Sequence, residues 1–378
     1  MTRTPVSLAL GGFLALAAGL GIGRFVYTPI LPPMVEALGL SKSQAGLIAS
    51  ANFVGYFAGA LLAALHLPGS RRAWLLAGLA VNILCLAAMG LTNSLTLFLL
   101  LRLMAGIASA FILIFASALV LDRLAVAGRS PLSAVHFAGV GGGIVVSAAL
   151  VATLSDWRIM WFAGAALALA ASVAVWTMVP PDRPHAAATT TSSRSKPNAR
   201  FLLLAAAYGL FGFGYIITAT FIVAMVRGSP EIASLESYIW VMFGLAAVPS
   251  VSLWTWLGQR FGVHAMFAAA AIVEAIGVAA SALWIGAATI ILSSVLVGGT
   301  FVGLTALGLV AAREGEGDPR SRIALMTASF SAGQILGPAF AGYAYDATGS
   351  FALPSWCAAA ALVIAAVLCR PIRNWSHS

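Results

Sequence analysis

Long apolar runs separated by short polar connections fill almost the whole chain. Each run is about 20 residues long, which is the length that an α-helix needs to cross the hydrocarbon core of a bilayer. Helices are the expected form, because lipid cannot satisfy an open backbone and a β-barrel would show short alternating strands. The pattern predicts twelve membrane-spanning helices, over residues 8–35, 44–66, 73–91, 95–120, 132–154, 157–179, 201–226, 237–257, 263–284, 287–311, 323–345 and 350–369.

The longest polar stretch lies near the middle of the chain and separates six predicted helices from six. It covers residues 180–200, is rich in Pro, Ser and Thr, and has no apolar periodicity, as is typical of a flexible linker. The prediction is therefore an all-α integral membrane protein with two pseudo-symmetric six-helix bundles, over residues 1–179 and 201–378. A weak internal repeat agrees, since residues 21–35 align without gaps to residues 212–226. Parallel repeats of this kind place a site between two bundles in transporters.

Basic residues alternate between the two sides of the predicted membrane. One side holds Arg3, Arg71, Arg72, Arg123, Arg129, Arg183, Arg194, Lys196, Arg200, Arg260, Arg313, Arg320, Arg322, Arg370 and Arg373. The other side holds Lys42, Arg158 and Arg227. The positive-inside rule then predicts a multi-pass protein of the bacterial inner membrane with both termini in the cytoplasm. Most of the net charge of +9 serves orientation, so we expect no nucleic acid as a partner.

The composition argues against an enzyme and against a sensor or scaffold with a soluble domain. Charged residues make up 8% of the chain, against roughly 25% in soluble globular domains. The three cysteines form no CxxC metal site, the histidines show no motif spacing, and no nucleotide-binding motif occurs. One of these histidines, His136, lies about a turn from a basic connection and is expected at the surface. We expect no catalytic residue, no metal and no cofactor.

Arg24 is the strongest candidate for a functional residue. It lies near the middle of the first predicted helix, where a charge costs roughly 2.5–3.5 kcal/mol. Tyr27 shares its helical face, and Pro29 and Pro32 interrupt the helical hydrogen bonds beyond it, so the bent part can act as a gate. The alternative is structural, with Arg24 capping carbonyl groups of a broken helix or pairing with an acid.

Arg102 and Glu274 are the other charged residues inside predicted helices. Arg102 is a candidate for substrate binding or proton coupling, and the alternative is an anchor that hydrogen-bonds neighbouring helices. Glu274 is a candidate proton carrier, because ionisable groups inside the membrane often form proton pathways. The first six predicted helices contain no acid to pair with the arginines. That favours an anionic substrate, most simply a small organic carboxylate, which a guanidinium binds in bidentate fashion.

Neutral polar side chains give the remaining candidates for substrate binding. They are Asn52 and Tyr56 on the second predicted helix, Tyr208 and Tyr215 on the seventh, and Thr300 on the tenth. An aromatic and hydroxyl lining suits a substrate with an apolar body. It therefore keeps open an alternative function, broad-specificity efflux of amphipathic compounds. The structural alternative for each residue is a hydrogen bond that holds two helices together.

Several motifs resemble the major facilitator superfamily of transporters. RLMAG, from Arg102 to Gly106, is similar to the RxxxG of motif B. GQILGPAFAG, which begins at Gly333, is similar to GxxxGPxxG of motif C and contains Gly337 and Pro338. The loop at residues 67–72 lacks the acidic residue of motif A. Residues 21–32 and 41–61 are similar to the YbfB/YjiJ-type branch.

This resemblance covers the whole chain and implies a mechanism. It implies alternating access around a midplane site, a small-molecule substrate and, by default, coupling to protons. It also implies that predicted helices 1, 4, 7 and 10 line the cavity while 3, 6, 9 and 12 face lipid, which places Glu274 outside the cavity. The motif glycines and prolines are expected to serve packing or gating. We expect a monomer that contacts substrate, proton and membrane lipid.

Overall fold

The computed structural model describes residues 4–65, 67–181, 198–283, 286–314 and 319–369. Most of the predicted linker at 180–200, and the basic residues within 182–197, lie outside these ranges. Every regular element in the described ranges is a helix, as predicted. The elements are α1 (Pro5–Leu16), a π-helical segment η1 (Ala17–Ile22), α2 (Tyr27–Leu38), α3 (Lys42–Ala63), α4 (Arg71–Met89), α5 (Leu95–Val126), η2 (Ser130–Leu132), α6 (Ser133–Ala152), α7 (Trp157–Met178), α8 (Ala199–Arg227), η3 (Ala233–Leu235), α9 (Glu236–Ala247), α10 (Ser250–Phe261), α11 (Val263–Leu283), α12 (Ala287–Arg313), α13 (Pro319–Thr348) and α14 (Ala352–Leu368).

Eleven helical stretches in the described residues are long and apolar enough to cross a bilayer, and α14 is a shorter apolar helix. The first stretch joins α1, η1 and α2, and the eighth joins η3, α9 and α10. Each of the twelve runs predicted from the hydrophobic pattern overlaps one of these helices. Interrupted helices therefore still count as single predicted spans, because the apolar run continues through the interruption.

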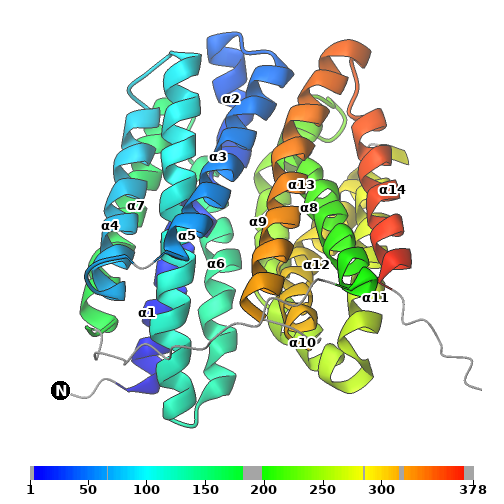
Figure 1. Ribbon diagram of the computed structural model, residues 1–378. Helices are drawn as coiled ribbons and strands as arrows, with labels where there is room; N and C mark the ends of the chain where they lie inside the picture. The colour runs from blue at the N-terminus through cyan, green and yellow to red at the C-terminus, as the bar shows by residue number, and fades with distance from the viewer. Residues whose placement is uncertain (1–3, 66, 182–197, 284–285, 315–318, 370–378) are drawn as a thin grey trace, which may run out of the picture.

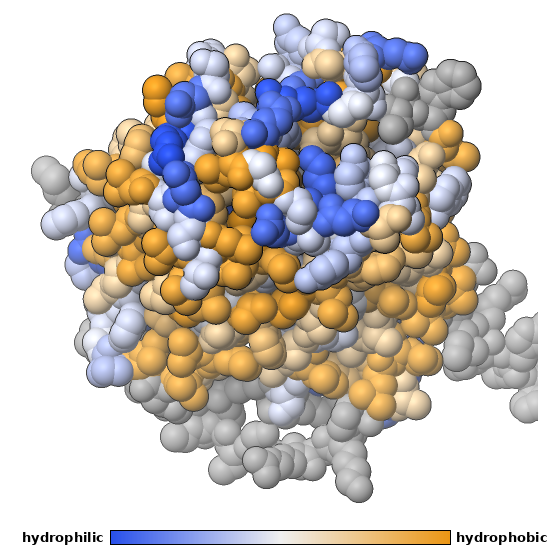
Figure 2. Space-filling view, turned by 90° about the horizontal axis from the view of Figure 1, so that it is seen from above, coloured by the Kyte–Doolittle hydropathy of each residue, from blue (hydrophilic) through white to orange (hydrophobic). Residues whose placement is uncertain are grey.

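The helices divide into two groups that stand side by side (Figure 1), with α1 to α7 on the left and α8 to α14 on the right. We call the end at which α2 leads into α3 the upper end, at the top of Figure 1, and the opposite end the lower end. Viewed from above, hydrophilic residues gather over part of the upper end while hydrophobic residues surround them (Figure 2). The apolar belt is the surface expected of helices in contact with lipid.

The main contacts between the two groups are those of α3 with α13, α6 with α9, and α2 with α8, and α6 also touches α10. Glycines allow two of these backbones to come close. A Cβ atom on Gly46 of α3 would overlap the carbonyl oxygen of Pro338 in α13, and one on Gly141 of α6 would overlap the backbone of α9 at Gly244. Small residues at such contacts are typical of membrane helices, where burial of apolar surface gives little drive for association.

The glycines of the predicted motifs lie at contacts within each group. A Cβ atom on Gly106 of α5 would overlap the carbonyl oxygen of Asn52 in α3. Gly333 and Gly337 of α13 lie in the same way against α8. Their closeness to neighbouring backbones gives these residues a packing role.

Candidate functional site

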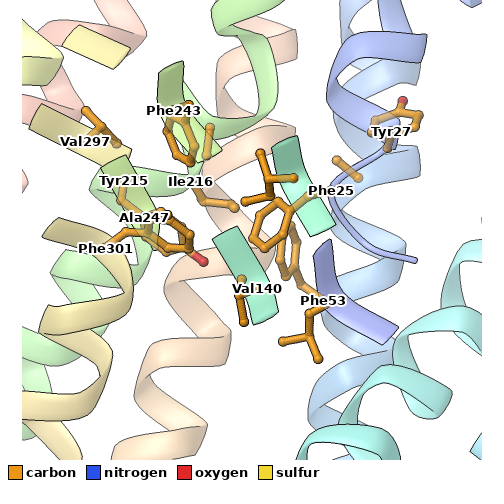
Figure 3. Close-up of a cluster of buried hydrophobic side chains, with 14 of the residues drawn as sticks. Phe25, Tyr27, Phe53, Val140, Tyr215, Ile216, Phe243, Ala247, Val297 and Phe301 are labelled. Carbon is orange, nitrogen blue, oxygen red and sulfur yellow. The ribbon is translucent and has the colours of Figure 1, made fainter. Parts of the chain in front are cut away.

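A cluster of buried side chains lies where the two groups of helices meet (Figure 3). The cluster contains Arg24, whose side chain belongs to the interrupted first span and is 6% exposed. Its guanidinium carbon lies 4.3 Å from the ring centroid of Phe53 and 4.7 Å from that of Tyr56. Aromatic faces attract a cation electrostatically, so these two rings of α3 stabilise the guanidinium.

The hydrogen-bonding edge of Arg24 is unused. Its Nε and Nη2 atoms are buried and have no hydrogen-bond partner among the described residues. The described ion pairs do not include Arg24 either. The titratable groups near enough to interact with it electrostatically are the phenols of Tyr56 and Tyr215 and the guanidinium of Arg102. Neither structural alternative for Arg24, carbonyl capping or pairing with an acid, is found in the described part of the chain.

Arg102 has the capping role instead. Its Nη1 donates to the carbonyl oxygen of Gly23 at 3.3 Å, and its Nη2 donates to that of Arg24 at 3.2 Å. The side-chain amide of Asn52 donates in turn to the carbonyl oxygen of Arg102 at 3.0 Å. Arg102, on α5, therefore fixes the interruption of the first span, which agrees with the interhelical anchor that was the alternative for this residue.

The path of the first span explains why those two carbonyl groups are free. The N–H groups of Gly23 and Phe25 donate to carbonyls five residues earlier, and that of Thr28 donates to Phe25 only three residues earlier. The regular four-residue ladder is lost between η1 and α2, so the carbonyls of residues 23 and 24 have no intrahelical donor. A buried carbonyl without a donor costs about 1–3 kcal/mol. The guanidinium of Arg102 supplies a donor to each of the two carbonyls and so removes this cost at both.

Tyr27 does not accompany Arg24, contrary to the sequence prediction. Its hydroxyl donates to the carbonyl oxygen of Ala45 at 2.8 Å, and its ring lies 5.0 Å from the guanidinium carbon of Arg102. Figure 3 shows it apart from Phe25 and from the rings of the second group. The turn at residues 23–26 breaks the helical phase, so a spacing of three residues no longer places both side chains on one face.

The second group of helices contributes a set of near-parallel rings. Tyr215 of α8 lies at the centre of the set, with its ring plane within 15° of Phe301, 25° of Phe211 and 4° of Phe330. Tyr208 extends the set, since its ring stacks on Phe330 at 4.8 Å, and its hydroxyl donates to the carbonyl of Thr305 at 3.0 Å. We call Tyr208, Phe211, Tyr215, Phe301 and Phe330 the ring stack.

Polar groups flank the ring stack. The hydroxyl of Tyr215 is hydrogen-bonded to the side-chain amide of Gln334 on α13, and Thr218 is buried one turn further along α8. Across the boundary between the groups, the ring of Phe25 meets that of Phe301 edge-on, with centroids 5.8 Å apart. Figure 3 shows Phe25 pointing toward the helices that carry Tyr215 and Phe301.

Glu274 of α11 is fully buried and faces the interior of its group. Neither carboxylate oxygen has a hydrogen-bond partner by geometry among the described residues. Thr300 of α12 lies beside the carboxyl, although its hydroxyl donates to the carbonyl of Leu296 at 2.7 Å. Tyr215 is near enough to Glu274 to feel its charge. Both neighbours belong to helices of its own group, α12 and α8, so the expectation that Glu274 lies outside the central cavity stays a prediction.

His136 is also buried, which corrects the expectation of a surface histidine. It is 0% exposed, and its Nε2 lies 3.0 Å from the hydroxyl of Ser117 on α5. Gly12 of α1 packs against its ring. Two helices that are distant from His136 in the sequence cover it, and local hydropathy cannot detect such cover.

Polar contacts join the two groups toward the upper end, and sequence reasoning did not predict them. Arg227 of α8 bridges Glu36 of α2 at 2.9 Å and Glu236 of α9 at 3.3 Å. Asp346 of α13 accepts hydrogen bonds from the N–H groups of Lys42 and Ser43, at 3.1 and 2.9 Å. These two residues begin α3, so the carboxylate sits at the positive end of a helix.

Two pockets of about 280 and 290 Å³ lie beside these contacts. Arg227 lines both of them, while Pro29 lines one and Pro32 lines the other. The prolines predicted to form a gate thus lie at the boundary between the groups.

The comparisons with known proteins agree with the fold. A family model described as "Uncharacterised MFS-type transporter YbfB" matches residues 16–370. The chain belongs to this family. It is therefore a transporter of the major facilitator superfamily, a multi-pass membrane protein that acts on a small molecule. No curated protein matches the sequence.

Solved structures of other transporters are similar to this family member. An Asp-to-Ala mutant of the nucleoside transporter NupG superposes with a TM-score of 0.74 at 17% identity, covering 96% of this chain and 98% of that one. A bacterial homolog of the human lysosomal transporter Spinster, inward-facing and unoccupied, superposes with a TM-score of 0.70 at 14% identity, covering 97% and 95%. At these identities the likeness shows the fold alone.

Proposed function

We propose that this protein is a secondary transporter that moves a small organic anion across the bacterial inner membrane by alternating access. Two six-helix bundles, residues 1–179 and 201–378, would rock about the cluster between them, with residues 180–200 as the cytosolic linker. The division of the described helices into two groups supports this arrangement (Figure 1).

The internal repeat supports a symmetric arrangement of the bundles. The hydroxyl of Thr28 donates to the carbonyl oxygen of Ala219 at 2.8 Å, and these residues are 191 positions apart. The same offset aligns residues 21–35 with 212–226, so Thr28 and Ala219 are equivalent positions of the repeat. Residues related by a two-fold axis can touch only where they lie beside that axis. A two-fold axis relating the bundles would therefore pass between α2 and α8.

The observation that carries the anionic substrate is the unused edge of Arg24. A guanidinium stays protonated in proteins, and a buried charge without a partner is costly. Arg102 uses both terminal nitrogens on the carbonyls of the first span, whereas in the described residues neither Nε nor Nη2 of Arg24 has a partner. An anion that enters between the bundles would complete those hydrogen bonds.

Proton coupling is supported by Glu274. Its buried carboxyl has no hydrogen-bond partner in the described geometry, and Tyr215 feels both this group and Arg24. A proton on Glu274 and an anion at Arg24 would each neutralise one buried charge. Symport of the two would then be favoured over movement of either alone.

The test is transport by protein reconstituted in vesicles, with and without a pH gradient, using a panel of acids, amines and neutral solutes. We expect uptake of one or more organic acids, lost in Arg24→Gln and kept in Arg129→Gln, whose arginine is exposed on a lower connection. Transport of amines alone, at equal rates in wild type and Arg24→Gln, would overturn the proposal.

Broad-specificity efflux of amphipathic compounds is the second candidate, and the ring stack favours it. Under that function, neutral and cationic amphipathic solutes of different shapes would be transported at similar rates. Arg24→Gln would then leave most of these rates unchanged, which separates this candidate from the anion transporter in one assay.

A further inference from the structure

The geometry points to a planar aromatic carboxylate as the substrate class. This inference rests on the proposed function, because it assumes that an anion binds at Arg24. It adds that the body of the anion is recognised by the ring stack. Two independent features of the cluster carry it: which edge of Arg24 is free, and how the rings opposite are oriented.

The free atoms of Arg24 select a carboxylate. Nε and Nη2 are both buried without a hydrogen-bond partner among the described residues, and they lie on the same edge of the guanidinium plane. That edge can donate two parallel hydrogen bonds to the two oxygens of one carboxylate. Phe53 and Tyr56 pack against the guanidinium, with ring centroids 4.3 and 4.7 Å from its central carbon. These contacts leave the edge formed by Nε and Nη2 without a hydrogen-bond partner.

The ring stack selects a planar body. Aromatic neighbours in proteins commonly meet edge-to-face or in offset stacks, and Tyr215 takes the stacked arrangement, within 4° of parallel with Phe330 and within 15° of Phe301. A set of parallel faces offers flat surfaces on which another ring can stack. A bulky aliphatic body would touch the same faces without the stacking contribution of about 0.5–1.5 kcal/mol.

A side chain of the first bundle now occupies the place between the two features. The ring of Phe25 sits against Phe301 at 5.8 Å with an interplanar angle of 76°, and Phe25 is the residue next to Arg24. When the bundles separate, Phe25 leaves Phe301 and exposes the edge of the ring stack. An aromatic acid bound at Arg24 would then meet Phe301 in place of the ring of Phe25, stacked or edge-on, and both arrangements favour an aromatic over an aliphatic body.

The experiment compares three probes of matched size on the purified full-length protein: benzoate, cyclohexanecarboxylate and benzamide. Benzoate carries both the ring and the charge, cyclohexanecarboxylate carries the charge alone, and benzamide carries the ring alone. We expect benzoate to bind about three- to tenfold more tightly than cyclohexanecarboxylate, from one stacking contact. Benzamide should bind more weakly than either acid. The affinity of each probe is measured by titrating it into the protein and recording the rise in unfolding temperature.

The outcomes separate this inference from the proposed function. Equal affinity for the two acids overturns the aromatic inference and leaves the anion transporter standing. Equal affinity for benzoate and benzamide, unchanged in Arg24→Gln, overturns the anion transporter itself. Binding of none of the three, with another acid transported in the vesicle assay, also overturns the aromatic inference.

Two variants locate the selectivity. Phe330→Leu should reduce the preference for benzoate over cyclohexanecarboxylate toward one, while Tyr215→Phe should keep the preference because it keeps the ring. The matched control is Phe340→Leu, which removes a ring that is 36% exposed on the same helix, α13. If Phe330→Leu and Phe340→Leu both left the preference intact, the ring stack would not be the recognition surface.

Discussion

The two buried arginines have opposite relations to their surroundings, although the sequence presents them alike. Arg102 donates to the carbonyls of Gly23 and Arg24 and is therefore part of the structure of the first span. Arg24 has Nε and Nη2 buried without a partner in the described residues, and its contacts are with the rings of Phe53 and Tyr56. Under the proposed function, anion binding and support of the first span therefore lie on different residues.

Substitutions at these positions should change stability in opposite directions. Arg102→Gln leaves at least one buried carbonyl without a donor and should lower the free energy of unfolding by about 1–3 kcal/mol. Arg24→Met removes an unpartnered buried charge and should raise the unfolding temperature while abolishing anion binding, as expected where function is kept at the cost of stability. Thermal unfolding of both variants in detergent measures the difference. A lower unfolding temperature for Arg24→Met would mean that its contacts with Phe53 and Tyr56 hold α3 in place.

Sequence reasoning could identify both arginines but could not assign their roles. The rarity of a charge inside an apolar run marks Arg24 and Arg102 equally. Which of them caps the helix depends on where the first span breaks, and that break lies at residues 23–26, before the prolines that predicted it. Rings such as Phe53, Phe301 and Phe330 were missed because an aromatic residue inside an apolar run carries no local signal of its partners.

At the scale of elements, the N-terminus of α3 and the end of α13 form a contact between the two groups. Asp346 accepts two backbone hydrogen bonds there and is exposed, so its contribution is modest. An anionic side chain at a helix N-terminus contributes about 0.3–1 kcal/mol. The ion pair between Arg227 and Glu36 acts at the same end, and together these contacts hold the upper end closed.

Removing the carboxylate of Asp346 should shift the protein toward a form that is open at the upper end. From that contribution, Asp346→Ala should raise the open-to-closed ratio about two- to fivefold. Spin labels at positions 37 and 347, in a variant without the native cysteines, report the separation of α2 and α13 as a distance distribution. Asp122→Ala is the matched control, since its carboxylate pairs with Arg71 within the first group. An unchanged distance distribution in Asp346→Ala would show that α3 and α13 come together at the upper end without this contact.

The element pattern itself was largely predictable. Twelve apolar runs overlap twelve helices because the length of a span is set by the bilayer and not by tertiary contacts. Interruptions inside a run were harder to predict from the sequence. Pro249 lies between α9 and α10, as expected of a residue that breaks helices, whereas η1 is a π-helical segment in a stretch without proline. Which helix faces contact one another required the folded chain, as Glu274 and His136 show.

For the whole molecule, the distribution of buried charge gives a physical reason why transport of the anion would be coupled to transport of a proton. Arg24 belongs to the first group of helices and Glu274 to the second, and Tyr215 lies within electrostatic reach of both. With neither ligand bound, each group of helices carries a buried ionisable side chain, Arg24 or Glu274, that forms no ion pair in the described part of the chain. With both an anion and a proton bound, each charge is neutralised separately. A state with only one ligand leaves one buried charge uncompensated, so it is the state least able to cross between conformations.

This arrangement predicts that Glu274→Gln uncouples transport from the proton without stopping it. The amide keeps the shape of a protonated carboxyl, so the anion-loaded form can always change conformation and exchange of labelled anion for unlabelled anion should continue. Accumulation driven by an inside-alkaline pH gradient should fall to the level seen without a gradient. Glu231→Gln, which alters an exposed carboxylate on the upper side, should keep both activities. Full gradient-driven accumulation in Glu274→Gln would show that another group carries the coupling proton. Loss of exchange as well as accumulation would show that Glu274 is needed for transport itself and not only for coupling.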